Sequence, residues 1–291
     1  MEIVMENVAL RVVISTAGGH IEEIADKRRG GSHYWPYDPA VWSRRTSVCF
    51  PICGGIPGQT YTYEGITYQM PMHGFLRDQL FEVTLQTPQE VWLEHRYTPE
   101  TLVMYPFFYS FQIRYRLGEG GLHVTYRVEN LSAYESMLFG VGSHYTYRVP
   151  VLEGESEQDV RLEFSPESSF TQLFLKDGLL SGQTAPFDHK KGLPLNRLDG
   201  SSLLLRCHHR TGGHEVALGN LKTGSRTAVA FRGFDYCVLW KPFVQAPFVC
   251  IEPWSSTPER EGSSGALEDR HAMTVLAPQS VQEFFIDIAV G

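Results

Sequence analysis

Long apolar segments are absent from this chain of 291 residues. No apolar run approaches the roughly 18–20 residues that a membrane-spanning helix requires. Residues 1–6 also lack the basic stretch and the apolar core of a secretory signal. We therefore expect a cytoplasmic protein that makes no contact with a membrane.

Positive charge is in deficit, because 25 lysines and arginines stand against 33 acidic residues and give a formal net charge of −8. This balance argues against broad electrostatic binding to nucleic acid or to anionic membranes. The doublets at residues 28–29 and 44–45 are too short to form a basic patch of their own. We expect neither nucleic acid nor membrane as a partner.

Cysteine is scarce and odd in number, with five residues that mostly lie inside apolar runs. This pattern favours buried, reduced thiols over a disulfide framework. Cys49 and Cys53 are close in sequence, but no matching second pair of cysteines exists, so these residues do not predict a structural zinc site.

Motifs of several large enzyme classes are missing as well. The chain has no G-x-S-x-G nucleophile elbow, no G-x-x-x-x-G-K-[ST] phosphate loop and no G-x-G-x-x-G that opens a helix. It shows no internal repeat, and no segment of about 12 or more residues keeps a helical period. These absences argue against the common hydrolase, nucleotide-binding and dinucleotide-binding classes, and against propellers and solenoids.

Short apolar segments bounded by turn residues are abundant, and their regular spacing is typical of an antiparallel sandwich. Residues 61–63 and 66–68, joined by Glu64 and Gly65, predict a hairpin. The other expected strands cover residues 8–14, 81–85, 91–95, 111–115, 122–128, 161–164, 202–206, 215–218, 227–231, 237–240, 248–251 and 283–288. We interpret the turn-rich stretches 153–159 and 255–266 as surface loops and predict one all-β domain over residues 1–291.

One carboxylate stands in an unusual place, because Glu252 follows the apolar run 248–251 and precedes Pro253 and Trp254. A carboxylate among apolar neighbours needs a partner or has a raised pKa, as a general base near neutrality does. A solvated strand cap or an ion-pair member is the alternative interpretation of the same residue.

Two of the 11 histidines share this character. His73 is followed by Gly74, and His144 ends a strand punctuated by glycines. If His73, His144 and Glu252 converge at one end of a sandwich, they suit either an acid–base pair or a metal site of two histidines and a carboxylate. Eight of the other histidines lie among polar or turn residues, which predicts solvated side chains: His33, His95, His123, His189, His208, His209, His214 and His271.

Several segments together resemble the aldose 1-epimerase (galactose mutarotase) family, in particular its LacX-like branch. The segments are FPICG at 50–54, YTYEG at 61–65 with Tyr68, MPMHGFLRD at 70–78, GSH at 142–144 and CIEPW at 250–254, and they occur in the order of that branch. The resemblance runs from about residue 8 to the C-terminus. It implies an antiparallel β-supersandwich that is galactose mutarotase-like, with a sugar pocket on one face.

The resemblance also implies an activity, the interconversion of the α and β anomers of an aldose by ring opening, without a cofactor or a metal. Glu252 would remove the proton of the C1 hydroxyl, and His144 would protonate the ring oxygen. His73 would hydrogen-bond the sugar near the same oxygen. Trp254, Trp240 and Phe75 are candidates for apolar contact with the sugar, and as large aromatics they are equally suited to the core.

The chain departs from the family pattern at two places. Tyr145 stands where many members have proline, and Gly55 stands where many have a substrate-binding arginine. Arg77, Arg44 or Arg45 could replace that arginine. Asp199 and Asp235 are both candidates for the family's sugar-binding aspartate.

Two alternatives to a mutarotase of neutral sugars therefore stay open. A hexose-6-phosphate 1-epimerase would need a basic rim, which Arg44, Arg45, Arg77 and Lys241 could build. A non-catalytic sugar-binding or sensory module would follow if the departures abolished turnover. In each case the expected partner is a small-molecule sugar, and the expected assembly is a monomer or a homodimer.

Overall fold

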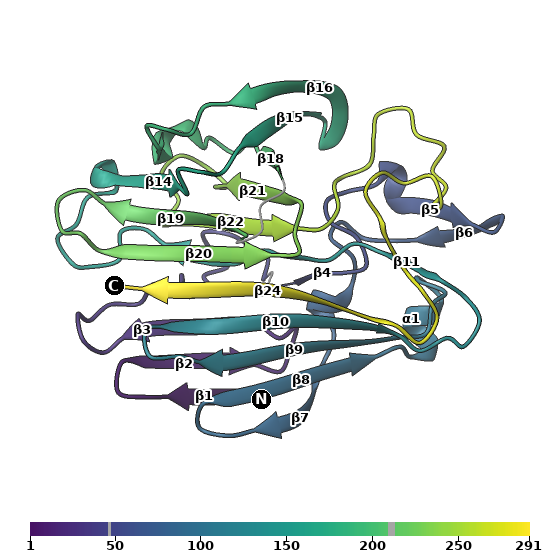
Figure 1. The fold of residues 1–291 in the computed structure, drawn as a ribbon, viewed down its shortest axis with the longest axis horizontal. Helices are drawn as coiled ribbons and strands as arrows, with labels where there is room; N and C mark the ends of the chain where they lie inside the picture. Colours follow the sequence, from purple (N-terminus) through teal and green to yellow (C-terminus); the bar gives the residue numbers. More distant parts are fainter. Residues whose placement is uncertain (46–47, 209–212) are drawn as a thin grey trace.

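The computed structural model describes residues 1–45, 48–208 and 213–291, and almost all of the regular elements in these ranges are β-strands (Figure 1). The larger sheet has nine strands in the order β17-β14-β19-β20-β24-β10-β9-β8-β7. Their bounds are β17 Leu193–Pro194, β14 Val160–Phe164, β19 His214–Asn220, β20 Arg226–Arg232, β24 Val281–Val290, β10 Gly121–Asn130, β9 Tyr109–Leu117, β8 Glu90–Arg96 and β7 Glu82–Gln86.

A second sheet of eight strands runs in the order β16-β15-β18-β21-β22-β12-β4, with β13 also paired to β22. Its strands are β16 Leu179–Phe187, β15 Phe170–Lys176, β18 Leu203–Cys207, β21 Tyr236–Trp240, β22 Phe248–Trp254, β12 Gly142–Ser143, β13 Thr146–Arg148 and β4 Val48–Cys49. Every pairing between the named strands of both sheets is antiparallel. The predicted all-β, antiparallel fold class is confirmed.

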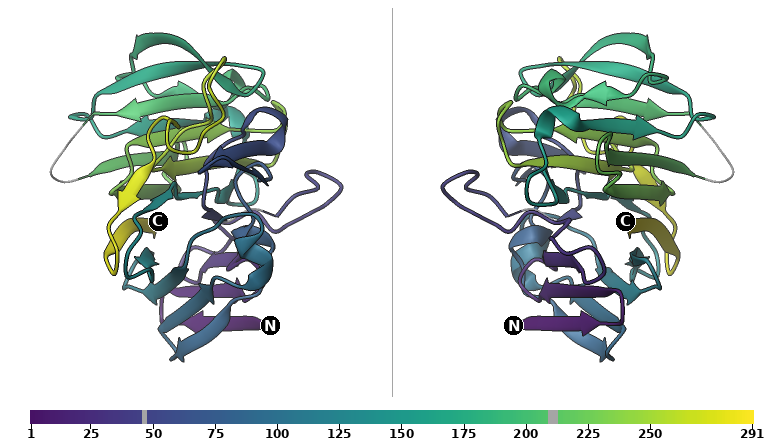
Figure 2. Two further views of the ribbon diagram at one scale, coloured as in Figure 1. Left: turned by 90° about the vertical axis from the view of Figure 1, so that its right-hand side faces the viewer. Right: turned by 90° about the vertical axis from the view of Figure 1, so that its left-hand side faces the viewer.

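Smaller elements complete the fold. A three-stranded sheet, β1 Glu2–Glu6, β2 Leu10–Ser15 and β3 Ile21–Asp26, lies beside β7–β9 in both views of Figure 2. The Tyr115 hydroxyl joins the two layers by donating to the Gly19 carbonyl at 2.6 Å. The remaining elements are β5 Thr60–Tyr63, β6 Ile66–Gln69, β11 Met137–Phe139, β23 Thr274–Leu276, the helix α1 Pro99–Leu102, and the 3₁₀ turns η1 Pro57–Gln59, η2 Leu76–Asp78, η3 Glu157–Asp159 and η4 Leu195–Arg197.

Burial along the strands explains how the sequence forms these layers. In β10 every second side chain is buried, as expected for a strand with one face on the core. All seven residues of β22 are buried, because paired strands flank it and both of its faces are covered. A polar side chain in β22 is therefore largely removed from water.

The predicted hairpin is confirmed as β5 and β6, with Thr62 opposite Thr67. Glu64 and Gly65 have φ angles of 48° and 77°, the left-handed pair that a two-residue turn of type I′ requires. Within the described ranges, no helix is long and apolar enough to cross a membrane.

Candidate active site

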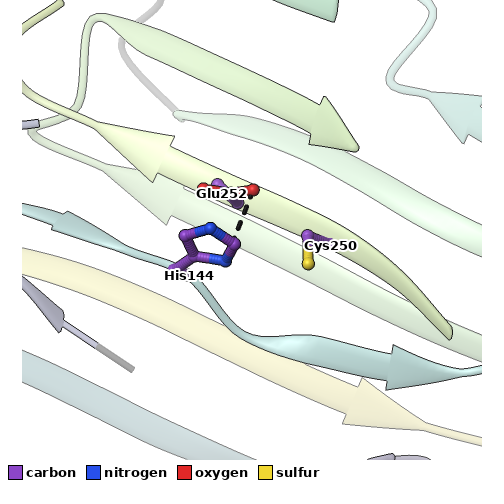
Figure 3. A group of neighbouring side chains, drawn as sticks. All are labelled: His144, Cys250 and Glu252. Atoms are coloured by element: carbon purple, nitrogen blue, oxygen red, sulfur yellow. Dashed lines mark ion pairs between the residues drawn. The ribbon is translucent and has the colours of Figure 1, made fainter. Parts of the chain in front are cut away.

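The register of β22 brings His144 and Glu252 together. Gly142 is paired with Trp254, and Thr146 is paired with Cys250, so the same register places His144 opposite Glu252. The Nδ1 atom of His144 lies 3.5 Å from Oε1 of Glu252 (Figure 3). Both residues are buried, with Glu252 only 1% exposed. Two polar residues far apart in sequence thus form a contact inside an apolar sheet.

His73 reaches the same place from a different segment. The chain at Gly74 forms a parallel bridge with Phe50, and Phe50 N–H donates to the His73 carbonyl at 3.1 Å. The ring centroid of His73 is 5.2 Å from that of His144 and 5.4 Å from that of Trp254. The convergence of His73, His144 and Glu252 is present in the structure.

Contacts of the His73 ring define its tautomer. The N–H of Gly54 donates to His73 Nδ1 at 3.2 Å, and the Cys49 thiol lies 3.4 Å from the same atom. A ring nitrogen that accepts from a backbone amide carries no proton, so the neutral ring has its hydrogen on Nε2. Burial lowers the pKa of His73 well below its usual value, and a positive charge on His144 would lower it further. His73 is therefore a neutral hydrogen-bond donor.

Gly74 is required where the chain passes Phe50. Its φ is +74°, and a Cβ at this position would lie 1.9 Å from the Phe50 carbonyl oxygen.

We expect Gly74→Ala to lower the free energy of unfolding by at least about 2 kcal/mol, because strain and a backbone clash add together. Gly65→Ala is the matched control, since Gly65 has φ +77° but no atom of the described residues lies within 4 Å of the added Cβ. Equal losses in urea unfolding of the two variants would contradict the clash.

A cavity of about 450 Å³ lies over this group of residues. Five of the residues predicted to form the site line it: His73, Arg77, His144, Glu252 and Trp254. The lining also contains residues that the sequence did not single out for the site, namely Trp42, Gln59, Pro71, Met72, Ser202 and Val238. Trp240 lines the cavity, whereas the other aromatic candidate, Phe75, is buried in the main core.

The two candidate aspartates are exposed and lie outside this lining. Asp199 accepts a hydrogen bond from the Ser201 N–H at 3.2 Å, in the loop before β18. The Asp235 carbonyl accepts from the Cys207 N–H at 2.8 Å, between β20 and β21. This placement does not support sugar contact by either carboxylate. Ser202, which follows Asp199 in the same loop, lines the cavity instead.

Aromatic rings enclose the acid–base pair. Trp42 stacks on His144 with ring centroids 5.4 Å apart, and Trp240 meets His144 edge-on at 5.9 Å. The Trp254 indole N–H donates to the Ser143 carbonyl at 3.2 Å, which fixes this ring beside β12. Trp42 lies in an irregular loop, so no strand pattern could have indicated its role.

This apolar enclosure shifts both members of the pair toward their neutral forms. Burial raises the pKa of Glu252 well above its ordinary value, and the nearby Cys53 adds to the effect. Burial lowers the pKa of His144 to about 3, and the positive charge of Arg77 acts in the same direction. Burial therefore favours the neutral carboxyl and the neutral imidazole, and the 3.5 Å contact joins the two groups between which a proton can pass. One carboxyl and one imidazole sharing a proton can act as acid and base on one substrate.

The raised pKa of Glu252 gives stability a pH dependence of known sign. Above the ordinary value of 4.5, ionisation favours the unfolded chain, in which this carboxyl is solvated. Glutamine is neutral at every pH, so we expect Glu252→Gln to gain stability relative to wild type as the pH rises from 4 to 8. Urea midpoints at both pH values measure this difference.

Glu155 provides a control of opposite sign. Burial raises its pKa, but hydrogen bonds from Ser225, Thr223 and two backbone N–H groups outweigh this and lower the pKa overall. Glu155→Gln should therefore lose stability relative to wild type over the same pH range. A Glu252→Gln variant that behaved like Glu155→Gln would contradict the burial of an uncompensated carboxyl.

The candidate arginines divide between the cavity and its surroundings. Arg77 is buried and lines the cavity, and Arg44 is exposed and lines it as well. Arg45 forms an ion pair with Glu22 at 2.9 Å, and the buried Lys241 pairs with Glu157; neither residue lines this cavity. Two of the four cations expected at the rim therefore face the site.

The expectation of solvated histidines is wrong for three residues. His33, His95 and His214 are buried, and each has a ring nitrogen in contact with a hydroxyl group. The hydroxyl partners are Thr227 for His33, Tyr109 for His95 and Ser168 for His214. His95 lies in β8 and His214 begins β19, where strand alternation sends their polar sequence neighbours to the opposite face, and this misled the prediction for these two residues. His209 lies outside the described residues.

Comparison with known proteins agrees with this antiparallel fold. The model of the aldose 1-epimerase family matches residues 1–261. The plasmid-borne LacX protein of Lactococcus lactis subsp. lactis is 30% identical over 303 residues, which cover 100% of this chain and 99% of LacX. The chain belongs to the aldose 1-epimerase family, and its resemblance to the LacX-like branch is confirmed.

Solved structures add the three-dimensional comparison. A galactose mutarotase related enzyme from Lactobacillus acidophilus is similar with a TM-score of 0.93 and 28% identity, over 100% of this chain and 97% of that one. A galactose mutarotase-like protein from Lactobacillus casei ATCC 334 has a TM-score of 0.90 and 24% identity, over 100% of both chains, and supports the fold alone. The galactose mutarotase-like supersandwich is thereby confirmed.

Proposed function

We propose that this chain is an aldose mutarotase that interconverts the α and β anomers of a sugar by acid–base ring opening. The observation that carries the proposal is the 3.5 Å contact between His144 and Glu252, two buried residues that line the cavity. Opening a hemiacetal requires the removal of one proton and the donation of another on the same small ring. A carboxyl and an imidazole that hold one proton between them meet this requirement.

In the proposed reaction, a proton first passes from the Glu252 carboxyl to His144 across their 3.5 Å contact. The Glu252 carboxylate then takes the proton of the C1 hydroxyl while the His144 imidazolium gives its proton to the ring oxygen. The bond between C1 and the ring oxygen breaks, and the open-chain aldehyde forms with its C1–O double bond. Rotation about the C1–C2 bond exposes the other face of the aldehyde. Closure with the roles reversed returns both protons and yields the other anomer.

The remaining lining fits the same substrate. The neutral His73, whose hydrogen lies on Nε2, can donate to the ring oxygen as negative charge develops there. Trp254 and Trp240 present ring surfaces to the cavity for the C–H groups of a sugar. A volume of about 450 Å³ is in the range of small-molecule sites. Both proton carriers belong to the chain itself, so the proposed reaction uses no cofactor.

Polarimetry of freshly dissolved α-D-glucose and α-D-galactose, with and without protein, tests the proposal. We expect the rate of approach to the equilibrium rotation to rise in proportion to protein concentration for at least one aldose in a wider panel. Binding of a sugar by calorimetry without any such acceleration would contradict the enzyme and identify the chain as a sugar-binding module.

A sugar phosphate is the second candidate substrate, favoured by the two arginines that line the cavity. Arg77 is buried there, and its nearest acidic partner, the exposed Asp78, is 3.6 Å from Nε. A guanidinium group in this position can bind a phosphate at one end of the sugar. The same proton transfers would then act on a hexose 6-phosphate.

Substitution of Arg77 distinguishes the two substrates. For a 6-phosphate substrate we expect Arg77→Gln to raise KM by about 10- to 100-fold, the value of one charged hydrogen bond, with a much smaller effect on a neutral hexose. Arg45→Gln is the control, since Arg45 pairs with Glu22 outside the lining. Equal KM increases for phosphorylated and neutral sugars would exclude a phosphate site at Arg77.

A further inference from the structure

A thiol lies beside the acid–base pair. Cys250 precedes Glu252 by two residues on β22, and successive side chains of a strand alternate between faces, so both belong to one face of the sheet. Figure 3 shows these two residues on one strand, with His144 across from them. One ligand atom from each of the three residues lies within 4.8 Å of the others, and all three residues are buried.

We propose that His144, Cys250 and Glu252 form an inhibitory site for a thiophilic divalent cation of the zinc type, which occupies the proton carriers of the mutarotase reaction. This set differs from the two histidines and one carboxylate that the sequence suggested, because the thiol takes the place of His73. The inhibition rests on the proposed function, whereas the binding of the cation does not.

The chemistry of the three donors suits such an ion. Thiolate, imidazole and carboxylate are the ligand types of zinc, and three protein ligands leave a fourth tetrahedral position for water. His144 and Glu252 line the cavity, so that position opens toward it. Glu252 Oε2 is buried and has no hydrogen-bond partner among the described residues, so an ion would satisfy this atom.

The geometry requires only a small adjustment. Zinc bonds of about 2.0–2.3 Å bring tetrahedral ligand atoms to roughly 3.5 Å from one another. The observed spread of up to 4.8 Å closes to this value if the side chains move by about 1 Å toward a common centre. Binding converts the Cys250 thiol to a thiolate and releases its proton, and it also displaces any proton held on the ligand atoms of His144 and Glu252. Affinity should therefore increase with pH.

The ion would stop the reaction directly. Lone pairs of Glu252 and His144 that exchange protons with the sugar would instead bind the metal. A sugar whose C1 hydroxyl and ring oxygen lie at these two residues would compete for the same space. We expect competitive inhibition of mutarotation by Zn²⁺ and reversal by a chelator.

Cobalt(II) provides a binding test that is independent of activity. Titration of the apoprotein with Co²⁺ should produce the near-ultraviolet absorption of a thiolate–cobalt bond with one ion per chain, and Zn²⁺ should displace it. Cys250→Ser should remove this band and raise the dissociation constant of Zn²⁺ at least about tenfold. Cys207→Ser is the matched control, because Cys207 is a buried cysteine of β18 on the same sheet, outside the three-residue group.

The outcomes separate the site from the reaction. A wild-type titration that produces no thiolate band would overturn the site, and this result does not depend on the folding of any variant. A band that survives Cys250→Ser and disappears in Cys207→Ser would also overturn the site. Tight binding by wild type with an unchanged polarimetric rate would overturn the inhibition. Loss of the band with retained mutarotation in Cys250→Ser would support both parts. Absence of mutarotation with any sugar would leave the binding result standing and remove only the proposed function.

Discussion

Glu252→Gln is expected to slow catalysed mutarotation by roughly 10³-fold, the middle of the range for loss of a general base. Glutamine keeps the size and the neutral hydrogen-bonding character of a protonated carboxyl, but it cannot take a proton from the C1 hydroxyl. Glu252 is 1% exposed and is flanked in β22 by apolar residues, none of which can take the proton in its place. Polarimetry at saturating sugar measures the loss as a fall in kcat.

The control for this variant is Glu259→Gln. Glu259 is also a buried acid, 4% exposed, but its Oε1 accepts from the Arg260 N–H and it does not line the cavity at His144 and Glu252. We expect its kcat to remain within about threefold of wild type, provided that both variants fold, as far-ultraviolet circular dichroism will show. A Glu252→Gln protein with the wild-type rate would remove Glu252 from the role of base.

His144→Asn is expected to lower kcat by roughly 10²–10³-fold, because the ring oxygen then leaves without a proton donor. Asparagine preserves a polar group near Nδ1 but cannot transfer a proton. The effect should fall on kcat more than on KM, since Trp42, Trp240 and Trp254 still line the cavity. Initial rates over a range of sugar concentrations separate the two constants.

His33→Asn is the matched control for His144→Asn. His33 is 1% exposed, its pKa is lowered to about 4 mainly by burial, and neither it nor its contact Thr227 lines the cavity. Loss of activity in His33→Asn equal to that in His144→Asn would indicate that a general loss of folding, rather than proton transfer, explains both. A His144→Asn variant with wild-type kcat would assign the acid to another group.

Strand spacing was sufficient to predict the antiparallel fold class, because alternation in segments such as β10 follows directly from one-sided burial. The hairpin at Glu64 and Gly65 was predictable for a similarly local reason, because its two-residue turn requires positive φ angles at both positions. Glu252 stood out because a carboxylate in an apolar run is rare. The family resemblance then supplied most of the argument that His73 and His144 accompany it.

Other parts of the site depend on long-range packing that no local pattern encodes. Trp42 and Ser202 come from irregular segments whose approach to the cavity is set by the whole fold. Arg77 could not be separated from Arg45 in the sequence, although Arg45 pairs with Glu22 and only Arg77 is buried in the cavity wall. Asp199 was a reasonable candidate by order along the chain, but its loop directs Ser202 to the cavity instead.

The register that sets His144 opposite Glu252 also constrains how this site can change over evolutionary time. If one residue were inserted or deleted between the pairs Gly142 with Trp254 and Thr146 with Cys250, the side chains that follow in that strand would point to the opposite face of the sheet. Ile251 or Pro253 would then lie opposite His144 in place of Glu252, and neither side chain can carry a proton. Descendants of this chain can lose the site by a single substitution, but they can change the length of this ladder only by abandoning the acid–base pair.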